Sequence, residues 1–180
     1  MKKPGDGKPN RKIALLGCGC FLSPFLLLVA MVVGTTAYNN FRLWQFERRF
    51  GAISHPPQSK LVARTHEIGL FGNGNHCDFL VAEVRSFNGS SNGVRNFYRK
   101  TRVAVPNRAD NGYSDVKNGT QPVETEFLRS PLPKNYRWKF SFAKPIDLSA
   151  SSGRKNLYVV FINNSGENNS WDSMFCLGCG

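Results

Sequence analysis

The chain has 180 residues, of which 41% are hydrophobic and 20% are charged, so it is long enough for one ordinary domain and too apolar for a disordered polyelectrolyte. Lysine and arginine outnumber aspartate and glutamate by 24 to 12, which gives a net charge of +12. The five cysteines are too few for a small disulfide scaffold, and no cofactor-binding or catalytic motif stands out.

The first segment predicts a membrane anchor. Residues 1–12 carry five Lys or Arg and one Asp, and the 25 residues from Ile13 to Ala37 carry no charge. As a helix this stretch is about 37 Å long, which is enough to cross the ~30 Å hydrocarbon core of a lipid bilayer. It must be helical there because lipid offers no partners for backbone groups. We therefore expect a transmembrane helix over 13–37, with a kink at Pro24.

Two other interpretations of this segment are weaker. A signal peptide cleaved after Ala37 fits the small residues Thr35 and Ala37, but its apolar stretch exceeds the usual length. A lipidation site at Cys18 has too short an apolar run before it. The basic residues before the helix outnumber the three arginines in the dozen residues after it, so we expect a cytoplasmic N-terminus and an extracytoplasmic C-terminal domain.

Residues 38–58 form the expected stem between the anchor and the head. Tyr38, Phe41 and Trp44 are amphipathic aromatic residues at the level where lipid headgroups would lie. The helix is expected to continue and to end near Gly51, before a proline pair. Two interpretations stay open here. Either the segment lies on the membrane surface with its arginines on acidic lipid, or its aromatic residues pack on the outer domain.

The pattern changes to short strands after the stem, so we take 59–180 as an extracytoplasmic domain. A Gly/Asn-rich turn between two strand-like runs predicts a hairpin, and apolar residues at helical spacing predict a short helix after it. The elements expected in this first half are hairpin strands at 60–70 and 77–87, a helix over 94–101, a strand at 103–105 and a loop over 107–121.

The second half of the domain has clearer alternation. In residues 123–127, Val, Thr and Phe alternate with two Glu. In residues 136–142, aromatic side chains alternate with Arg, Lys and Ser, which predicts a strand with one aromatic and one basic face. Residues 157–162 are apolar throughout, which predicts a central strand, and 173–179 is a candidate edge strand. The sequence thus predicts an α+β fold, in which a transmembrane helix continues into a stem and then into an antiparallel sheet of about five strands with one short helix.

Three cysteines lie in the outer domain, where an oxidising compartment permits disulfides. We favour a bond between Cys77 and Cys176, which closes a loop of roughly 100 residues and would contribute about 4–5 kcal/mol in the chain-entropy model. A bond between Cys176 and Cys179 is the alternative. Either pairing leaves one thiol over.

The run around the first hairpin turn is the densest group of unusual residues in the chain. Glycine amides in such a turn are suited to holding an anion, although neither a phosphate-loop nor a dinucleotide-binding pattern is present. A tight turn is the simpler interpretation. The residues of this candidate turn or ligand site are Gly72, Asn73, Gly74, Asn75, His76 and Asp78.

An alternative function is an extracytoplasmic enzyme or metal-binding protein that uses His66, His76, Cys77 and Asp78. Consecutive residues on a strand point to opposite faces of the sheet, and the chain has no zinc-binding spacing. We therefore expect no metal and no cofactor.

Basic side chains are the remaining candidates for a binding surface, namely Arg95, Arg99, Lys100, Arg102, Arg137 and Lys139. Such a surface is suited to anionic lipid or an anionic envelope polymer. Nucleic acid is not expected, because no stacking motif accompanies the charge. A protein partner or self-association through the small residues near Gly17 is a further option. The sequence favours a non-enzymatic, interaction or structural role, with a basic face presented near the membrane.

Overall fold

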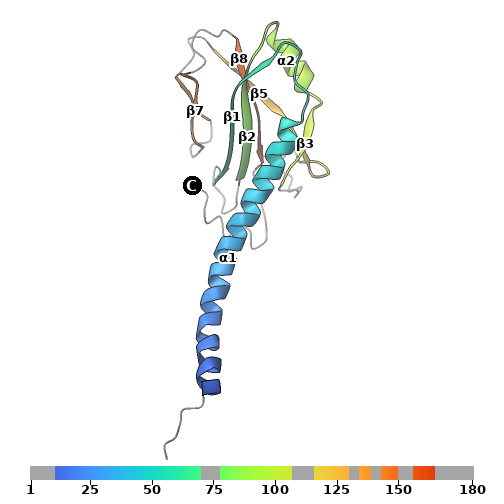
Figure 1. The fold of residues 1–180 in the computed structure, drawn as a ribbon. Coiled ribbons are helices and arrows are strands. Elements are labelled where there is room, and N and C mark those ends of the chain that lie inside the picture. Colours follow the sequence, from blue (N-terminus) through green and yellow to red (C-terminus); the bar gives the residue numbers. More distant parts are fainter. Residues whose placement is uncertain are drawn as a thin grey trace, which may run out of the picture.

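The computed structural model describes residues 11–69, 78–106, 116–129, 134–138, 143–149 and 156–164, and their side chains from Ser23 onward. One long helix, α1 (Arg11–Gly51), protrudes from a head that is built on an antiparallel sheet (Figure 1). A short helix, α2 (Ser91–Tyr98), lies at the end of the head farthest from the protruding part of α1. The mixed α+β class predicted from the sequence is confirmed.

Helix α1 is continuous over 41 residues and runs through Pro24 without interruption. Of its large apolar side chains between Phe25 and Val33, all but Val32 are 39–64% exposed. Among the described residues, Ser23–Gly51 is the one helical stretch long and apolar enough to cross a membrane. The expected anchor and the first part of the expected stem are therefore a single element, with no break at Ala37.

The main sheet has four antiparallel strands in the order β1-β2-β8-β5. This is fewer than the expected sheet of about five, because other short segments pair with each other as two separate ribbons, β3 with β4 and β6 with β7. The strands are β1 (Lys60–Gly69), β2 (Asp78–Ser86), β3 (Arg102–Ala104), β4 (Thr120–Pro122), β5 (Glu124–Leu128), β6 (Asn135–Tyr136), β7 (Ile146–Asp147) and β8 (Leu157–Asn164). The apolar strand β8 lies between β2 and β5, as its composition predicts.

The expected loop over 107–121 is wrong at its C-terminal end. Lys117 and Thr120 exchange two backbone hydrogen bonds of 2.8 and 2.9 Å around Asn118 and Gly119. Both central residues have a positive φ, 52° and 69°, which is the conformation that favours Asn-Gly in a tight hairpin turn. Strand β4 follows this turn directly, while residues 107–115 lie outside the described part of the chain.

The expected strand over 136–142 is also only partly correct. Strand β6 ends at Tyr136, and residues 137–138 continue without strand pairing. Residues 139–142 and the candidate edge strand at 173–179 lie outside the described residues.

The main sheet separates two hydrophobic clusters. On one face, Phe46 and Phe50 of α1 pack with Phe79, Val81 and Tyr158 of the sheet. On the other face, the ribbon of β6 and β7 supplies a cover that includes Tyr136, Trp138, Ile146 and Leu148. Full burial of one phenylalanine side chain contributes about 1.5–3 kcal/mol. The upper part of α1 is therefore an integral part of the core of the head.

Candidate functional site

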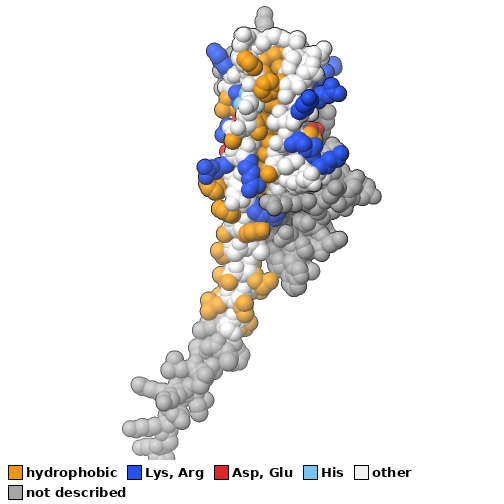
Figure 2. Space-filling view, turned by 90° about the vertical axis from the view of Figure 1, so that its right-hand side faces the viewer, with side chains coloured by type: hydrophobic (Ala, Val, Ile, Leu, Met, Phe, Trp, Pro, Cys, Tyr) orange, Lys and Arg blue, Asp and Glu red, His pale blue; other side chains and the backbone are white. Residues whose placement is uncertain are grey.

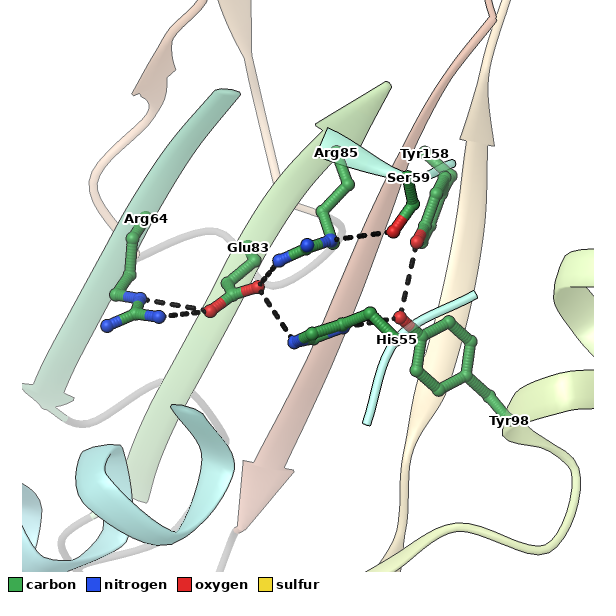
Figure 3. A network of polar contacts seen from close by, with 7 residues as sticks. All are labelled: His55, Ser59, Arg64, Glu83, Arg85, Tyr98 and Tyr158. Atoms are coloured by element: carbon green, nitrogen blue, oxygen red, sulfur yellow. Dashed lines mark hydrogen bonds and ion pairs between the residues drawn. The ribbon is translucent and has the colours of Figure 1, made fainter. Parts of the chain in front are cut away.

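Strand β2 begins with Asp78 and carries two further ionisable side chains, Glu83 and Arg85, within an otherwise apolar run. Side chains alternate between the faces of a sheet, so Glu83 and Arg85 share the α1 face with Phe79 and Val81. The side chain of Glu83 is fully buried, and that of Arg85 is 11% exposed. A buried carboxylate is stable only when it is paired, so the contacts of Glu83 define the centre of the candidate site (Figure 3).

Two arginines hold the carboxylate of Glu83 from opposite sides. Arg64 lies directly across on β1 and donates from Nε and Nη2 to Oε1, at 3.0 and 2.5 Å. Arg85 donates from Nη1 to Oε2 at 2.5 Å and from Nε to Ser59 Oγ at 3.2 Å. Both carboxylate oxygens therefore accept charged hydrogen bonds, which are stronger than neutral ones.

His55, in the connector after α1, extends the network toward α2. Its Nε2 lies 3.5 Å from Glu83 Oε2, its Nδ1 lies 2.7 Å from the Tyr98 hydroxyl, and that hydroxyl lies 3.2 Å from the Tyr158 hydroxyl. Because a carboxylate only accepts, a neutral imidazole with its proton on Nε2 satisfies both contacts of the ring. Tyr98 then donates to His55 Nδ1, and Tyr158 donates to Tyr98.

Burial keeps the two titratable rings of this network uncharged. Burial lowers the pKa of His55 from its ordinary 6.5, and the positive charge of Arg85 lowers it further, against the opposite effect of Glu83. Burial also raises the pKa of Tyr98 above its ordinary value, and the hydrogen bond with Tyr158 adds to this. At neutral pH the histidine is therefore a neutral imidazole and Tyr98 a neutral phenol.

The chain of contacts from the Glu83 carboxylate through the His55 imidazole to the Tyr98 hydroxyl has the same order as a nucleophilic triad. Its hydroxyl, however, cannot act as a nucleophile. Tyr98 is 1% exposed and its oxygen already contacts Tyr158, so a substrate atom has no access to it. The raised pKa also disfavours the phenolate that would act as the nucleophile. The network instead ties the connector, β1 and α2 to β2 and β8. We regard it as the structural centre that fixes the head at the end of α1.

The sequence analysis missed this network. The available signal was the pair Glu83 and Arg85 inside the apolar run of β2, because charged residues are almost never fully buried without partners. Their partners come from distant parts of the chain. Tyr98 and Tyr158, for example, are 60 residues apart. No spacing or motif in the sequence links these positions.

The predicted basic residues occupy different parts of the head. Arg95, Arg99 and Lys100 are exposed on and directly after α2, and we call them the distal basic cluster. Arg102 donates to the hydroxyl and carbonyl oxygens of Thr120, across the β3–β4 ribbon. Arg137 is exposed after β6, and Lys139 lies outside the described residues. The distal basic cluster lies at the end of the head opposite the protruding part of α1 (Figure 1).

A second basic group, which sequence analysis placed in the stem, lies on α1 where the helix enters the head. We call Arg42, Arg48 and Arg49 the basic collar. Arg42 donates from Nη2 to the carbonyl oxygen of Pro106 at 2.8 Å, and the guanidinium of Arg48 lies 5.0 Å from the ring centre of Trp44. Figure 2 shows Lys and Arg side chains over the head and hydrophobic side chains along the protruding part of α1 below them.

The packed-stalk interpretation describes one side of the stem helix, and contact of the stem with the membrane surface stays a prediction. Leu43, Phe46 and Phe50 are buried in the core of the head, as a packed stalk would require. Phe41 and Trp44 point away from that core and remain about half exposed, at 52 and 49%. The aromatic residues of the stem therefore serve two different surfaces.

The alternative enzyme or metal site is not assembled from the residues that can be placed. His66 lies on the α1 face of β1, where its Nδ1 is 3.2 Å from Glu47 Oε1. Asp78 begins β2, is buried, and shares the opposite face with Leu80 by the alternation of the strand. Within the described ranges, no group of three or more His, Cys, Asp or Glu is arranged to hold a metal ion.

The other residues predicted for a site or a disulfide lie outside the described part of the chain. They are the turn residues Gly72, Asn73, Gly74, Asn75 and His76, and the cysteines Cys77, Cys176 and Cys179.

Comparison with known proteins adds no further constraint. No protein-family profile matches the chain, and searches of curated proteins and of solved structures found no significant similarity.

Proposed function

We propose that this chain is a single-pass membrane protein whose head has a non-enzymatic, interaction or structural role on the extracytoplasmic side. The observation that carries the proposal is the division of α1 into two environments. Side chains from Phe25 to Val33 are apolar and exposed, whereas Leu43, Phe46 and Phe50 belong to the core of the head. A contiguous exposed apolar surface of this kind is typical of contact with lipid or with a partner.

The continuity of α1 supports a head held at a fixed height. Gly51 lies 14 residues after Ala37, which is about 21 Å along the helix. The sheet packs along this same stretch, so the head has no hinge at the point where α1 would leave the bilayer. The basic residues before the helix support a cytoplasmic N-terminus.

The distal basic cluster supports an anionic partner at the outer end of the head. Between Asn88 and Ala109 the sequence has five Lys or Arg and no Asp or Glu. Arg95, Arg99 and Lys100 are exposed, and α2 faces away from the anchor. An anionic polymer of the cell envelope fits this charge and this position.

The membrane placement is tested with the full chain carrying a tag at each end. We expect alkaline carbonate washing to leave the protein in the membrane pellet. Protease added to spheroplasts should remove the C-terminal tag and leave the N-terminal tag intact. Release by carbonate, or a protected C-terminal tag, would overturn the proposal.

The binding role is tested separately with polyphosphate as the polyanion probe. The double variant Arg99→Gln/Lys100→Gln should weaken binding at least fivefold, and added salt should weaken wild-type binding. Lys134→Gln/Arg137→Gln removes the same charge from exposed positions near β6 and serves as the control. An equal loss in both double variants would contradict a specific role of the distal basic cluster.

A further inference from the structure

A cavity of about 310 Å³ lies between α1 and the segment that follows β3. Val105 and Pro106 form its outer side. This volume is at the lower end of the range for small-ligand pockets, so it suits a small chemical group rather than a segment of another protein. The side chains that α1 contributes are Tyr38, Phe41, Arg42, Gln45 and Arg49.

The cavity lies at the level where α1 leaves its uncharged stretch. Tyr38 directly follows that stretch, and Arg42 lies five residues above Ala37, which is about 7.5 Å along the helix. The polar layer of a bilayer extends roughly 5–8 Å beyond the hydrocarbon on each side. Helical side chains also lean toward the N-terminus of their helix, which here directs Arg49 toward the bilayer. The lower part of the cavity, at Tyr38 and Arg42, therefore lies in the headgroup layer, and Arg49, about 18 Å above Ala37 along the helix, reaches toward it from above.

The lining of the cavity has the chemistry of a phosphate site. Arg42 and Arg49 supply two guanidinium groups, Gln45 supplies an amide, and no lining side chain is acidic. The nearby acidic residue of α1, Glu47, contacts His66 on β1 instead. Arginine binds phosphate oxygens through paired hydrogen bonds, and Phe41 adds an apolar surface beside them.

Contacts with the head already hold Arg42 in place before any ligand arrives. Its Nη2 donates to the carbonyl oxygen of Pro106 at 2.8 Å. Its guanidinium carbon lies 5.4 Å from the ring centre of Tyr38 and 5.1 Å from that of Phe79. A guanidinium that is already oriented loses little further conformational entropy when it binds an anion.

We infer that this cavity binds the phosphate of an anionic phospholipid headgroup, from the leaflet on the same side as the head. The inference rests on the proposed function, because only a membrane-spanning α1 places the cavity in the headgroup layer. The bound lipid lies between two parts of the chain, since its phosphate contacts the arginines of α1 while Val105 and Pro106 of the segment after β3 line the same cavity. A headgroup held there fixes the height of the head above the bilayer.

The test compares two neighbouring arginines in the full chain. Both side chains are exposed, but Arg49 lines the cavity, whereas Arg48, one residue earlier, packs over Trp44. Dioctanoyl phosphatidylglycerol is titrated into the protein in neutral detergent micelles, and lipid retention is measured by native mass spectrometry. We expect Arg49→Gln to weaken retention about tenfold and Arg48→Gln to change it less than twofold. Equal losses in both variants would overturn the inference, because they indicate a diffuse attraction to the basic collar.

A second variant and two competing ligands complete the design. Gln45→Glu places a carboxylate in the cavity and should weaken lipid retention by a similar factor. This variant tests the cavity if circular dichroism shows that Arg49→Gln is misfolded. Dioctanoyl phosphatidylcholine should bind at least tenfold more weakly, and glycerol 3-phosphate should not displace the anionic lipid at equal concentration. Equal retention of the zwitterionic lipid, or equal displacement by the soluble phosphate, would overturn the lipid assignment.

Flotation separates this inference from the proposed function. Wild type and Arg49→Gln should both float with pure phosphatidylcholine vesicles, because insertion of α1 does not require the cavity. Failure of the wild type to float would contradict the proposed function itself. Flotation of both proteins without the predicted effect of Arg49→Gln on lipid retention would contradict only the inference that the cavity binds lipid.

Discussion

At Glu83, strand β2 places a fully buried carboxylate on the sheet face that also carries the apolar cluster of Phe79, Val81 and α1. Its desolvation is offset by Arg64 and Arg85, whose guanidinium groups occupy both carboxylate oxygens. Such a cluster is not necessarily more stable than an apolar replacement of the same shape. It is sensitive to the loss of one member, because the remaining charges stay buried.

Replacing Glu83 with glutamine should therefore destabilise the protein strongly. Arg85, whose side chain is 11% exposed, would lose its counter-charge, and the cost of breaking a buried pair is about 3–5 kcal/mol. The measurement is urea unfolding of the full chain in detergent micelles, followed by near-UV circular dichroism. Lys60→Gln, which removes a charge from an exposed position of β1, is the control and should change the free energy of unfolding by less than about 0.5 kcal/mol. A loss below about 1 kcal/mol in Glu83→Gln would contradict the structural role of the network.

His55 makes the same network sensitive to pH. Burial, and then Arg85, lower the pKa of His55 in the folded state below 6.5, so below that pH the unfolded chain binds more protons at this ring. The contribution of His55 to stability is thus fully present above about pH 6.5 and is lost as the pH falls toward the lowered pKa. Unfolding free energies at pH 7.5 and 5.5 should differ less in His55→Gln than in wild type. An equal difference in His55→Gln and wild type would contradict this role of His55.

At the scale of the element, α1 combines two functions that are usually separate. Its lower part presents apolar side chains on all sides, whereas its upper part buries Leu43, Phe46 and Phe50 at helical spacing. The length of the helix and the limits of most strands were predictable from the sequence, because the uncharged run and the alternating runs are long. Which face of the stem is buried was not predictable, because aromatic residues lie on both faces.

The short elements were harder to predict for a local reason. The ribbons β3–β4 and β6–β7 have strands of two or three residues, which are too short for an alternating pattern to show. The Asn118-Gly119 pair did carry a signal, since this dipeptide is the strongest short-range indication of a hairpin. The candidate site was hidden for another reason, because Glu83 and His55 are distant in the sequence and are brought together only in the folded chain.

Two phenylalanines on α1 offer a direct test of its packing. Phe46→Ala should destabilise the head by about 3–5 kcal/mol, because it leaves a cavity beside Phe79 and Val81. Phe41→Ala removes the same ring from a position that is 52% exposed and should cost less than about 1 kcal/mol. Urea unfolding of both variants in micelles measures the difference. Similar costs for the two changes would show that α1 does not pack on the sheet in this way.

At the scale of the whole molecule, α1 and the sheet bury side chains in one common cluster, so we expect them to unfold together. Phe46 and Phe50 form one cluster with side chains of β2 and β8, so exposing the upper part of α1 also exposes the sheet. Hydrogen exchange measured on the full chain in micelles should therefore give residues 43–50 the same opening free energy as β2 and β8. Exchange at 43–50 that is faster by orders of magnitude would indicate a stem that opens independently of the head.

Because α1 continues without a break from its exposed apolar part into the core, the head must tilt together with the helix. The part of α1 above the bilayer is about 21 Å long, so a change of 10° in the tilt of the helix moves its C-terminal end sideways by about 4 Å. Tilt responds to the thickness of the surrounding bilayer. In a membrane, local lipid composition would then set the direction in which α2 points, without any contact between lipid and α2.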